Sequence, residues 1–543
     1  MKFLPIASIL SLSLVAAIDP LTFKGSKIFN SKTGDQFYFK GLAYQPKKGA
    51  TTVPLDPLAD EVGCARDVAN FKDLGINSIR VYEIDNSKNH DKCMNALSAA
   101  GIYVMLDLST PYTSIPRDAP YWDTYLLNSY KLTIDAFSKY DNLAGFIIGN
   151  EITNDVKTIP ASAFVKASLR DVKTYIKSKK LSIPVGYVDN DDEAIRESLI
   201  QYFNCGDDPL ATVDFYGINT YRWCGNATFK SSLYPEMLEP LANYSVPYLL
   251  TEYGCNEVTP RSFKEVASIY GPDMQDLTSG GFLFEYTNES NNYGIVDVSY
   301  GSTSVTKLAD YNTFKTALSN VSPKGTTLNS YNPSLKSSTC PSVSGNWTIG
   351  SVLPPSPNLN LCNCLSTTFS CSLPSSFNPQ NSDQSSALAA QISYLCGVSD
   401  CSAISTDVTK GVYGQYSACT PIQKANLILS QNYAKNNNAA SACAINNLGS
   451  NLSTNSSAAS INNCKSISGN TVNSTPVADM GPDGLTKGSP TPVDVTSPGN
   501  STSNGSSSGS ASGNNSTSSS KSSASTTAIS FVALSVTLFA LLL

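Results

Sequence analysis

The chain has 543 residues, more than one ordinary domain needs and enough for a barrel of roughly 250–300 residues with additions. Its formal net charge is -6 and its sequence pI is about 5.1, so nucleic-acid binding, which needs a basic surface, is not expected. His90 is the only histidine, and a Ser-His-Asp triad or a multi-histidine metal site is therefore not expected either. We expect no metal and no cofactor, and chemistry that rests on carboxylates, tyrosines and amides.

The first 17 residues are typical of a secretory signal peptide. Lys2 precedes an apolar run from Phe3 to Ala17, and Val15-Ala16-Ala17 fits a small-residue cleavage site. A membrane anchor is the alternative, but the run is short for a span of the bilayer. The sequence therefore predicts export through the secretory pathway.

Short apolar segments alternate with helical segments over the next 300 residues or so. Strands are expected at 36–44, 76–82, 102–108, 143–151, 183–189, 213–221, 246–253 and 280–286, and helices at 67–74, 91–100, 121–140 and 161–180. Strands that alternate with helices form βαβ units and a parallel sheet. Eight such strands predict a closed (β/α)8 TIM barrel over residues 18–335.

The composition changes beyond the barrel. Residues 336–361 are rich in Pro, Ser and Asn and are expected to be a linker, and 362–468 form a small, disulfide-rich, mainly helical module. Residues 469–520 are expected to be a glycosylated, serine-rich stalk. Residues 497–525 contain 15 serines and one charged residue, so they cannot bury enough apolar surface to fold.

The last segment is typical of a GPI-attachment signal. Small residues from Gly513 to Ser520 precede an almost wholly apolar run from Ala528 to Leu543. We expect residues 521–543 to be a propeptide that is replaced by a GPI anchor, with the attachment residue in the 513–520 region. This predicts a protein at the outer face of the plasma membrane or in the cell wall; a true tail anchor is the alternative.

Fourteen cysteines in a secreted chain are expected to pair. They fall into two sets, each with an even number of cysteines, which suggests two separately cross-linked units. Six are spread through the barrel region and its exit (Cys64, Cys93, Cys205, Cys224, Cys255, Cys340), and eight lie between Cys362 and Cys464. Glycosylation sequons support a secreted surface, among them those at Asn226, Asn243, Asn288, Asn320, Asn346, Asn451 and Asn473.

Two glutamates follow predicted barrel strands. Glu151 ends the apolar stretch 143–151, and Glu252 ends the stretch 246–253. The carboxyl ends of the strands form the catalytic face of such a barrel, so both carboxylates are expected there. A strand that simply ends in polar residues is the alternative for either glutamate alone. Together they match the two carboxylates that glycoside chemistry requires.

The arrangement resembles the large clan of retaining barrel glycosidases, which have Asn-Glu after strand four and Glu after strand seven. By this resemblance Glu151 is the acid/base, Glu252 is the nucleophile that forms a covalent glycosyl-enzyme, and Asn150 binds the 2-hydroxyl of the sugar. Each of these roles is an expectation.

A narrower resemblance covers nearly the whole chain. The chain is similar to fungal β-1,3-glucanosyltransferases of glycoside hydrolase family 72 in its order of segments and in the motifs Lys40-Gly-Leu-Ala-Tyr-Gln45, Arg80-Val-Tyr82, Ile148-Gly-Asn-Glu151, Tyr187-Val-Asp-Asn-Asp191 and Thr251-Glu-Tyr-Gly254. This implies a monomer that cleaves inside a β-1,3-glucan donor and joins the new reducing end to the non-reducing end of an acceptor. Cell-wall glucan would be elongated.

Two other functions stay open. An endo-β-1,3-glucanase would share every catalytic residue, because only the choice of water or sugar as acceptor differs. A non-catalytic, glucan-binding wall protein is the third possibility. The presence of Asn150, Glu151 and Glu252 argues against it.

The resemblance implies further contacts with the donor. Tyr82 would stack on, or hydrogen-bond to, the donor sugar, although packing in the barrel wall is the alternative. The loop from Ser109 to Arg117 would line donor subsites.

On the other side, Asp191 and Arg196 would contribute to acceptor binding, and Tyr221 could orient the nucleophile. The family motif after strand eight has a tyrosine where this chain has Phe284, so Tyr286 is the candidate substrate contact there.

The cysteine-rich region, with Cys362-Asn-Cys364, Tyr394-Leu-Cys396-Gly397 and Gly411-Val-Tyr-Gly-Gln-Tyr416, looks like a family 43 carbohydrate-binding module. This implies either β-1,3-glucan binding or a buttress for the barrel. The resemblance also implies disulfides Cys64–Cys93, Cys205–Cys340, Cys224–Cys255 and Cys396–Cys401, with three longer-range links in the module.

Overall fold

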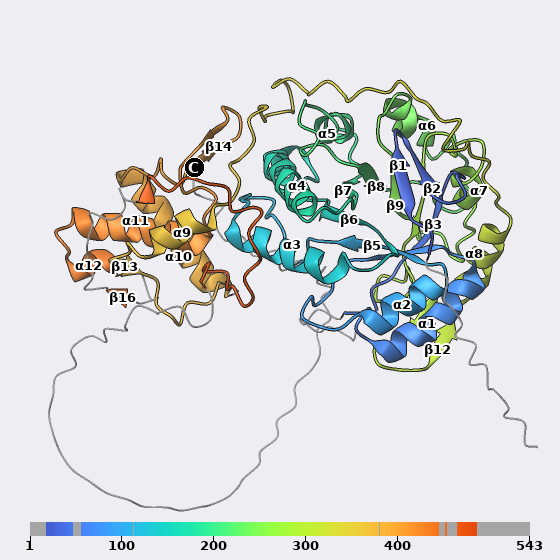
Figure 1. The fold of residues 1–543 in the computed structure, drawn as a ribbon, viewed down its shortest axis with the longest axis horizontal. Coiled ribbons are helices and arrows are strands. Elements are labelled where there is room, and N and C mark those ends of the chain that lie inside the picture. Colours follow the sequence, from blue (N-terminus) through green and yellow to red (C-terminus); the bar gives the residue numbers. More distant parts are fainter. Residues whose placement is uncertain are drawn as a thin grey trace, which may run out of the picture.

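The computed structural model describes residues 18–46, 56–111, 113–379, 381–444, 451–452 and 464–485 (Figure 1). The expected signal peptide, most of the expected stalk and the expected GPI propeptide lie outside these residues. Among the residues described, no helix is both long and apolar enough to cross a membrane.

Eight parallel strands close into a barrel, which confirms the predicted fold class (Figure 1). The strands are β3 (Phe39–Ala43), β4 (Ser78–Val81), β5 (Tyr103–Asp107), β6 (Leu143–Asn150), β7 (Val185–Asn190), β8 (Phe215–Asn219), β9 (Tyr248–Tyr253) and β10 (Gly280–Leu283). Each pairs with its neighbour in chain order, and β10 pairs with β3, where Gly280 lies opposite Phe39, to close the barrel.

Helices cover the outside of the barrel (Figure 1). They are α1 (Glu61–Leu74), α2 (Asp91–Ala99), α3 (Thr124–Phe137), α4 (Ala161–Ser178), α5 (Arg196–Phe203), α6 (Tyr234–Leu238), α7 (Glu265–Ile269) and α8 (Ala309–Ser319), with short 3-10 helices at Val156–Thr158 and Glu239–Leu241. The sequence placed the start of α1 at residue 67. The helix starts earlier because the Asp60 side chain caps it, accepting from Gly63 N at 3.1 Å.

The barrel strands are apolar on both faces because both faces are buried. In β6, Ile147 packs in the barrel interior, while Phe146 and Ile148 pack against the outer helices. The antiparallel hairpin of β1 (Leu21–Lys24) and β2 (Lys27–Asn30) packs on this interior cluster through Phe23, whose ring centroid is 6.1 Å from that of Phe215.

The cysteine-rich region has its own hydrophobic core. It contains α9 (Leu359–Ser366), α10 (Ser382–Val398), α11 (Pro421–Lys435), α12 (Ala440–Cys443) and the short strands β13 (Cys371–Ser372), β14 (Thr406–Asp407), β15 (Val412–Tyr413) and β16 (Asn451–Leu452). A further hairpin, β11 (Val296–Val298) with β12 (Val305–Lys307), follows the last barrel strand.

All fourteen cysteines are paired in seven disulfides. The barrel and its exit hold Cys64–Cys93, Cys205–Cys340 and Cys224–Cys255, and the module holds Cys362–Cys419, Cys364–Cys464, Cys371–Cys443 and Cys396–Cys401. Four of these are the pairs that the resemblance implies. No disulfide joins the two sets, which matches the two separately cross-linked units suggested by the cysteine counts.

The module lies beside α3 and α4 (Figure 1). Arg170 on α4 donates to Pro354 O at 3.0 Å, and Asn128 on α3 exchanges two hydrogen bonds with the Val477 backbone. Val472 is fully buried. Residues 469–485 therefore belong to the folded part, which differs from the sequence-based expectation of a stalk from residue 469 onward.

Candidate active site

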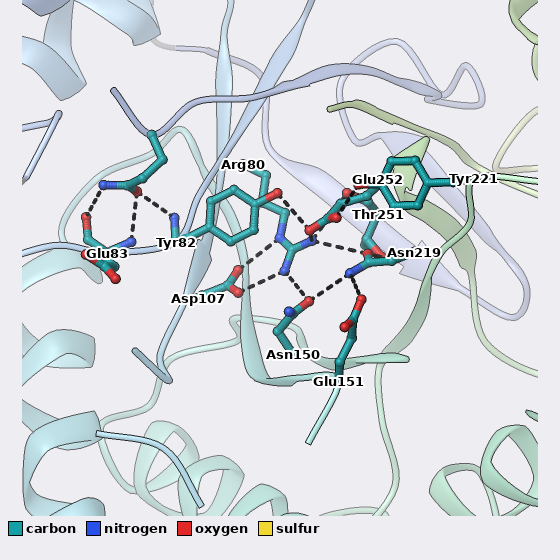
Figure 2. A network of polar contacts seen from close by, with 11 residues as sticks. Arg80, Tyr82, Glu83, Asp107, Asn150, Glu151, Asn219, Tyr221, Thr251 and Glu252 are labelled. Carbon is teal, nitrogen blue, oxygen red and sulfur yellow. Dashed lines mark hydrogen bonds and ion pairs between the residues drawn. The ribbon is translucent and has the colours of Figure 1, made fainter. Parts of the chain in front are cut away.

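Arg80 on β4 lies at the centre of a polar network at the carboxyl ends of the strands (Figure 2). The guanidinium is fully buried and makes a two-pronged pair with Asp107, with Nε–Oδ1 and Nη2–Oδ2 distances of 3.1 and 2.9 Å. Nη1 also donates to Glu252 Oε1 at 3.1 Å, and Nη2 donates to Asn150 Oδ1 at 2.8 Å. A buried charge is tolerated when it is paired and fully hydrogen-bonded, and this one joins β4 to β5, β6, β8 and β9.

Of the two candidate glutamates, Glu252 on β9 accepts more hydrogen bonds from the described part of the protein. Besides Arg80, the hydroxyl of Tyr82 donates to Oε1 at 3.0 Å and that of Tyr221 donates to Oε2 at 2.6 Å. The Arg80 guanidinium also stacks on the Tyr82 ring, 4.3 Å from its centroid. Donors to a carboxylate favour its charged form, which a nucleophile requires.

Glu151 follows β6 directly and has a φ of 50°. This left-handed conformation costs about 1 kcal/mol or more for a residue other than glycine, so the surrounding contacts must hold it. Its N–H donates to Val188 O at 2.8 Å, and Arg117 Nε donates to its carbonyl at 3.0 Å. The strained turn places the carboxylate where Asn219 Nδ2 donates to Oε1 at 2.7 Å.

Two asparagines connect the glutamates. Asn219 Nδ2 donates to Asn150 Oδ1 at 3.1 Å as well as to Glu151, and Asn219 Oδ1 accepts from Thr251 Oγ1 at 3.0 Å. Because the Asn150 oxygen accepts from both Arg80 and Asn219, the orientation of its amide is fixed. The Nδ2 group can then donate to a ligand hydroxyl.

The electrostatics of the site couple the two carboxylates. Burial raises the pKa of Glu252 to about 7; Arg80 opposes this rise, the charge of Glu151 adds to it, and the hydroxyls of Tyr221 and Tyr82 oppose it. Burial also raises the pKa of Asp107, against the effect of Arg80. The negative charge of Glu151 is thus one of the causes that hold the pKa of Glu252 above its ordinary value.

Asp191 and Arg196 also come together. Arg196 Nη1 donates to Asp191 Oδ1 at 2.5 Å, and the other oxygen accepts from Arg222 Nε at 2.5 Å and from Thr220 Oγ1 at 2.8 Å. Since Arg222 follows Tyr221 directly, this cluster lies beside the glutamates on the β7 and β8 side of the barrel mouth.

The remaining predicted residues are more scattered. Ser109 is buried just after β5, and Arg117 is exposed and reaches the Glu151 backbone. Tyr286 is fully buried and donates to Asp67 Oδ1 on α1 at 2.6 Å. The prediction that Tyr286 contacts substrate is therefore wrong for this structure, because its hydroxyl is held in the helix layer; Phe284 and Tyr293 lie beside Tyr221 instead.

Sequence reasoning gave no role to Arg80 or Asn219. Each stands two residues before a predicted site tyrosine, Tyr82 and Tyr221 respectively. Because strand side chains alternate between faces, this spacing was a signal that each pair shares the inner face. A charged or amide residue on the inner face of an apolar strand is a candidate for the site.

The fold and this site are those of a glycoside-processing barrel enzyme, with two glutamates at the carboxyl ends of the strands. A family model described as glucanosyltransferase matches residues 10–322, and one described as X8 domain matches residues 376–450. The chain belongs to the glucanosyltransferase family.

Similar proteins and similar solved structures support this family membership. The chain is 42% identical to Protein EPD1 of Candida maltosa over 429 residues, which are 78% of this chain and 76% of that protein. It is 41% identical to 1,3-beta-glucanosyltransferase GAS2 of Saccharomyces cerevisiae over 428 residues, 76% of each chain. A Saccharomyces cerevisiae Gas2p glutamate-to-glutamine mutant in complex with laminaritetraose and laminaripentaose has a TM-score of 0.74 at 38% identity, covering 83% of this chain and 99% of that one.

Proposed function

We propose that this chain is a retaining β-1,3-glucanosyltransferase in which Glu252 is the nucleophile and Glu151 the acid/base. The observation that carries the assignment of roles is the unequal supply of donors. Glu252 accepts from Arg80, Tyr82 and Tyr221, whereas the Glu151 side chain accepts from Asn219 within the described part of the chain. The three donors to Glu252 oppose the rise in its pKa that burial causes and hold both of its oxygens in place for attack, so the proton transfers are assigned to Glu151.

In the first step Glu252 attacks the anomeric carbon of a donor sugar. The bond from that carbon to the glycosidic oxygen breaks, and Glu151 gives its proton to the departing oxygen. The product is an ester between the shortened donor and Glu252. Asn150 Nδ2, whose amide is fixed by Arg80 and Asn219, is placed to donate to the sugar hydroxyl next to the reacting carbon.

In the second step Glu151, now ionised, removes a proton from a hydroxyl at the non-reducing end of an acceptor glucan. The acceptor oxygen attacks the anomeric carbon and Glu252 leaves as a carboxylate, so atoms and charge balance. If water takes the place of the acceptor, the same groups hydrolyse the glucan. The family supports transfer, and hydrolysis is the second candidate.

A reduced laminari-oligosaccharide incubated with the purified protein tests the proposal. Transfer yields products longer than the starting chain. Shorter products alone would show an endo-β-1,3-glucanase, and an unchanged substrate would show a binding protein. Covalent trapping by an activated 2-fluoro glucoside should label Glu252, and the Glu252→Gln variant should not be labelled; labelling of that variant would contradict the assignment.

The module is proposed to contribute both support and glucan contact. The contacts of the segments on either side of it with α3 and α4 support the role of a buttress. Tyr394 on α10 is 66% exposed, and an exposed ring is a surface on which a sugar face can stack. Sedimentation with insoluble β-1,3-glucan compares Glu252→Gln with Glu252→Gln/Tyr394→Ala; equal binding would leave the module as a buttress alone.

We also propose that the protein is an exported, glycosylated monomer with a GPI anchor, at the outer face of the plasma membrane or in the cell wall. The apolar run after Lys2 and the apolar run from Ala528 to Leu543 support export and anchoring. Five sequon asparagines are exposed (Asn226, Asn243, Asn320, Asn346, Asn473). Release from cells by phosphatidylinositol-specific phospholipase C tests the anchor.

A further inference from the structure

Arg261, in the loop between β9 and α7, makes an unusually broad set of contacts for a residue outside the site. It is 3% exposed, and Nε donates to Asp310 Oδ2 on α8 at 2.7 Å. Nη1 donates to Phe284 O at 3.1 Å and to Gly254 O at 3.4 Å, and Nη2 donates to Tyr293 O at 2.6 Å. One side chain thus fixes the exits of β9 and β10 and the loop that follows β10.

Two of these carbonyls belong to residues whose rings surround Tyr221. Tyr221, Phe284 and Tyr293 form a cluster, here the aromatic wall, with ring centroids 6.1 Å (Tyr221–Phe284), 5.4 Å (Tyr221–Tyr293) and 5.3 Å (Phe284–Tyr293) apart and edge-to-face angles. Edge-to-face contacts of this kind are favourable beyond the burial of the rings, so the wall restricts the ring of Tyr221. The hydroxyl of that ring donates to Glu252.

We propose that Arg261 is a positioning residue for the nucleophile: by holding the Phe284 and Tyr293 backbones, it keeps the aromatic wall on Tyr221 and the Tyr221 hydroxyl on Glu252. The same side chain fixes Gly254, two residues after Glu252, so it acts on the nucleophile from two directions. The inference rests on the proposed role of Glu252. It adds a residue that touches neither substrate nor Glu252.

The geometry of Arg261 separates positioning from charge balance. Its charge is already met by Asp310, so the bonds to three carbonyls are not needed for neutrality. A guanidinium reaches several acceptors with a planar, rigid set of donors, whereas an ammonium is a single point. Arg261→Lys can therefore keep the pair with Asp310 and lose most of the carbonyl contacts.

If the aromatic wall loosens, the pKa of Glu252 changes in a defined direction. The groups that face Glu252 are Arg80 and Tyr82 from β4 and its exit, Glu151 after β6, Tyr221 after β8 and, further away, Tyr293 after β10. The Tyr221 hydroxyl lowers the pKa of Glu252. When that bond lengthens, the pKa of Glu252 rises, the ionised fraction at a given pH falls, and the acid limb of the activity profile moves to higher pH.

The test compares the pH dependence of kcat/KM for the full chain and for Arg261→Lys, Arg261→Gln and Tyr293→Ala, with Tyr221→Phe as the reference for complete loss of the hydroxyl. We expect the three variants to shift the acid limb upward, by less than Tyr221→Phe does, and to lose roughly tenfold in kcat/KM near that limb. Arg170→Gln is the matched control. Arg170 also bonds an aspartate and a backbone carbonyl, but at the junction with residues 354–356, and its loss should leave the limb in place.

Two results overturn the inference. One is an unshifted acid limb in Arg261→Lys and Tyr293→Ala; the other is an equal shift in Arg170→Gln. If Arg261→Gln does not fold, the other two variants decide, because Tyr293→Ala removes only a half-buried ring and Arg261→Lys keeps the charge. A native protein without activity on laminari-oligosaccharides would instead refute the proposed function.

Discussion

Arg80 Nη1 lies 3.1 Å from Oε1 of Glu252, and Nε and Nη2 of the same guanidinium donate to the two carboxylate oxygens of Asp107. Arg80 therefore offsets the charge of Glu252, the proposed nucleophile, while Asp107 fixes the plane of the guanidinium. We expect Arg80→Lys to lower kcat/KM roughly 30- to 100-fold, since the point charge of lysine cannot serve Asp107, Glu252 and Asn150 together.

The measurement is steady-state kinetics on laminari-oligosaccharides with a parallel thermal melt. Arg66→Lys is the control, since Arg66 makes a similar two-pronged pair with Asp67 on α1, away from the glutamates. Comparable activity losses in both variants would indicate a general packing effect and contradict a specific role for Arg80.

The two tyrosines that serve Glu252 should not be equivalent. Oε1 accepts from both Arg80 and Tyr82, whereas Tyr221 is the donor to Oε2 within the described part of the chain. Tyr221→Phe should therefore reduce kcat/KM more than Tyr82→Phe, and only the former should move the acid limb markedly upward. Kinetics over a pH series measures both effects, and an equal or reversed order would show that the bound substrate, not this geometry, sets the roles of the hydroxyls.

The free energy of unfolding should fall as the pH rises through the range in which Glu252, the proposed nucleophile, ionises. Burial raises the pKa of Glu252 to about 7, so folding favours its protonated form. The stability this contributes is complete below the ordinary pKa of 4.5 and is lost as the pH climbs to about 7. Glu252→Gln stays neutral, so it should gain stability relative to the native protein between these values, by at most about 3 kcal/mol.

Thermal melts of the native protein and Glu252→Gln at pH 4 and pH 8 measure that difference. Glu257→Gln on the exposed loop after β9 is the control and should follow the native protein at both pH values. A gap between Glu252→Gln and the native protein that does not widen toward pH 8 would show that Arg80 and the hydroxyls fully offset the effect of burial.

The sequence was sufficient for the barrel because its strands are buried on both faces and end abruptly in polar residues. That pattern located Glu151 and Glu252 at the ends of β6 and β9. It could not give the network around Arg80, because those contacts join side chains from strands far apart in the chain. The helices after β7 to β10 include two of only five residues, α6 and α7, which are too short to show a periodic pattern.

The failure at Tyr286 has a specific cause. The prediction rested on the family motif after strand eight, in which Phe284 replaces a tyrosine and Tyr286 stands two residues further on. The strand ends at Leu283, however, and the Tyr286 side chain lies against α1. There Asp67 accepts from the Tyr286 hydroxyl at 2.6 Å and from the Tyr44 hydroxyl at 2.9 Å, next to the seam where β10 meets β3.

Two substitutions at Glu151 can separate the strain of its backbone from the chemistry of its side chain. With a φ of 50°, any residue with a Cβ is strained there, and glycine is not. Glu151→Gly and Glu151→Ala both remove the carboxylate, yet the glycine variant should be the more stable by about 1 kcal/mol, the reverse of the usual order of these residues.

Chemical denaturation of the two variants measures this difference. Both variants should still form the glycosyl-enzyme from a donor with an activated leaving group, because such a group needs no acid to depart. Azide should accelerate the breakdown of the glycosyl-enzyme in both variants, because the anion can occupy the space of the missing carboxylate and needs no base to attack. If the alanine variant is the more stable, the turn is not strained. If azide has no effect in either variant while the Glu252 ester still forms, Glu151 is not the base of the second step.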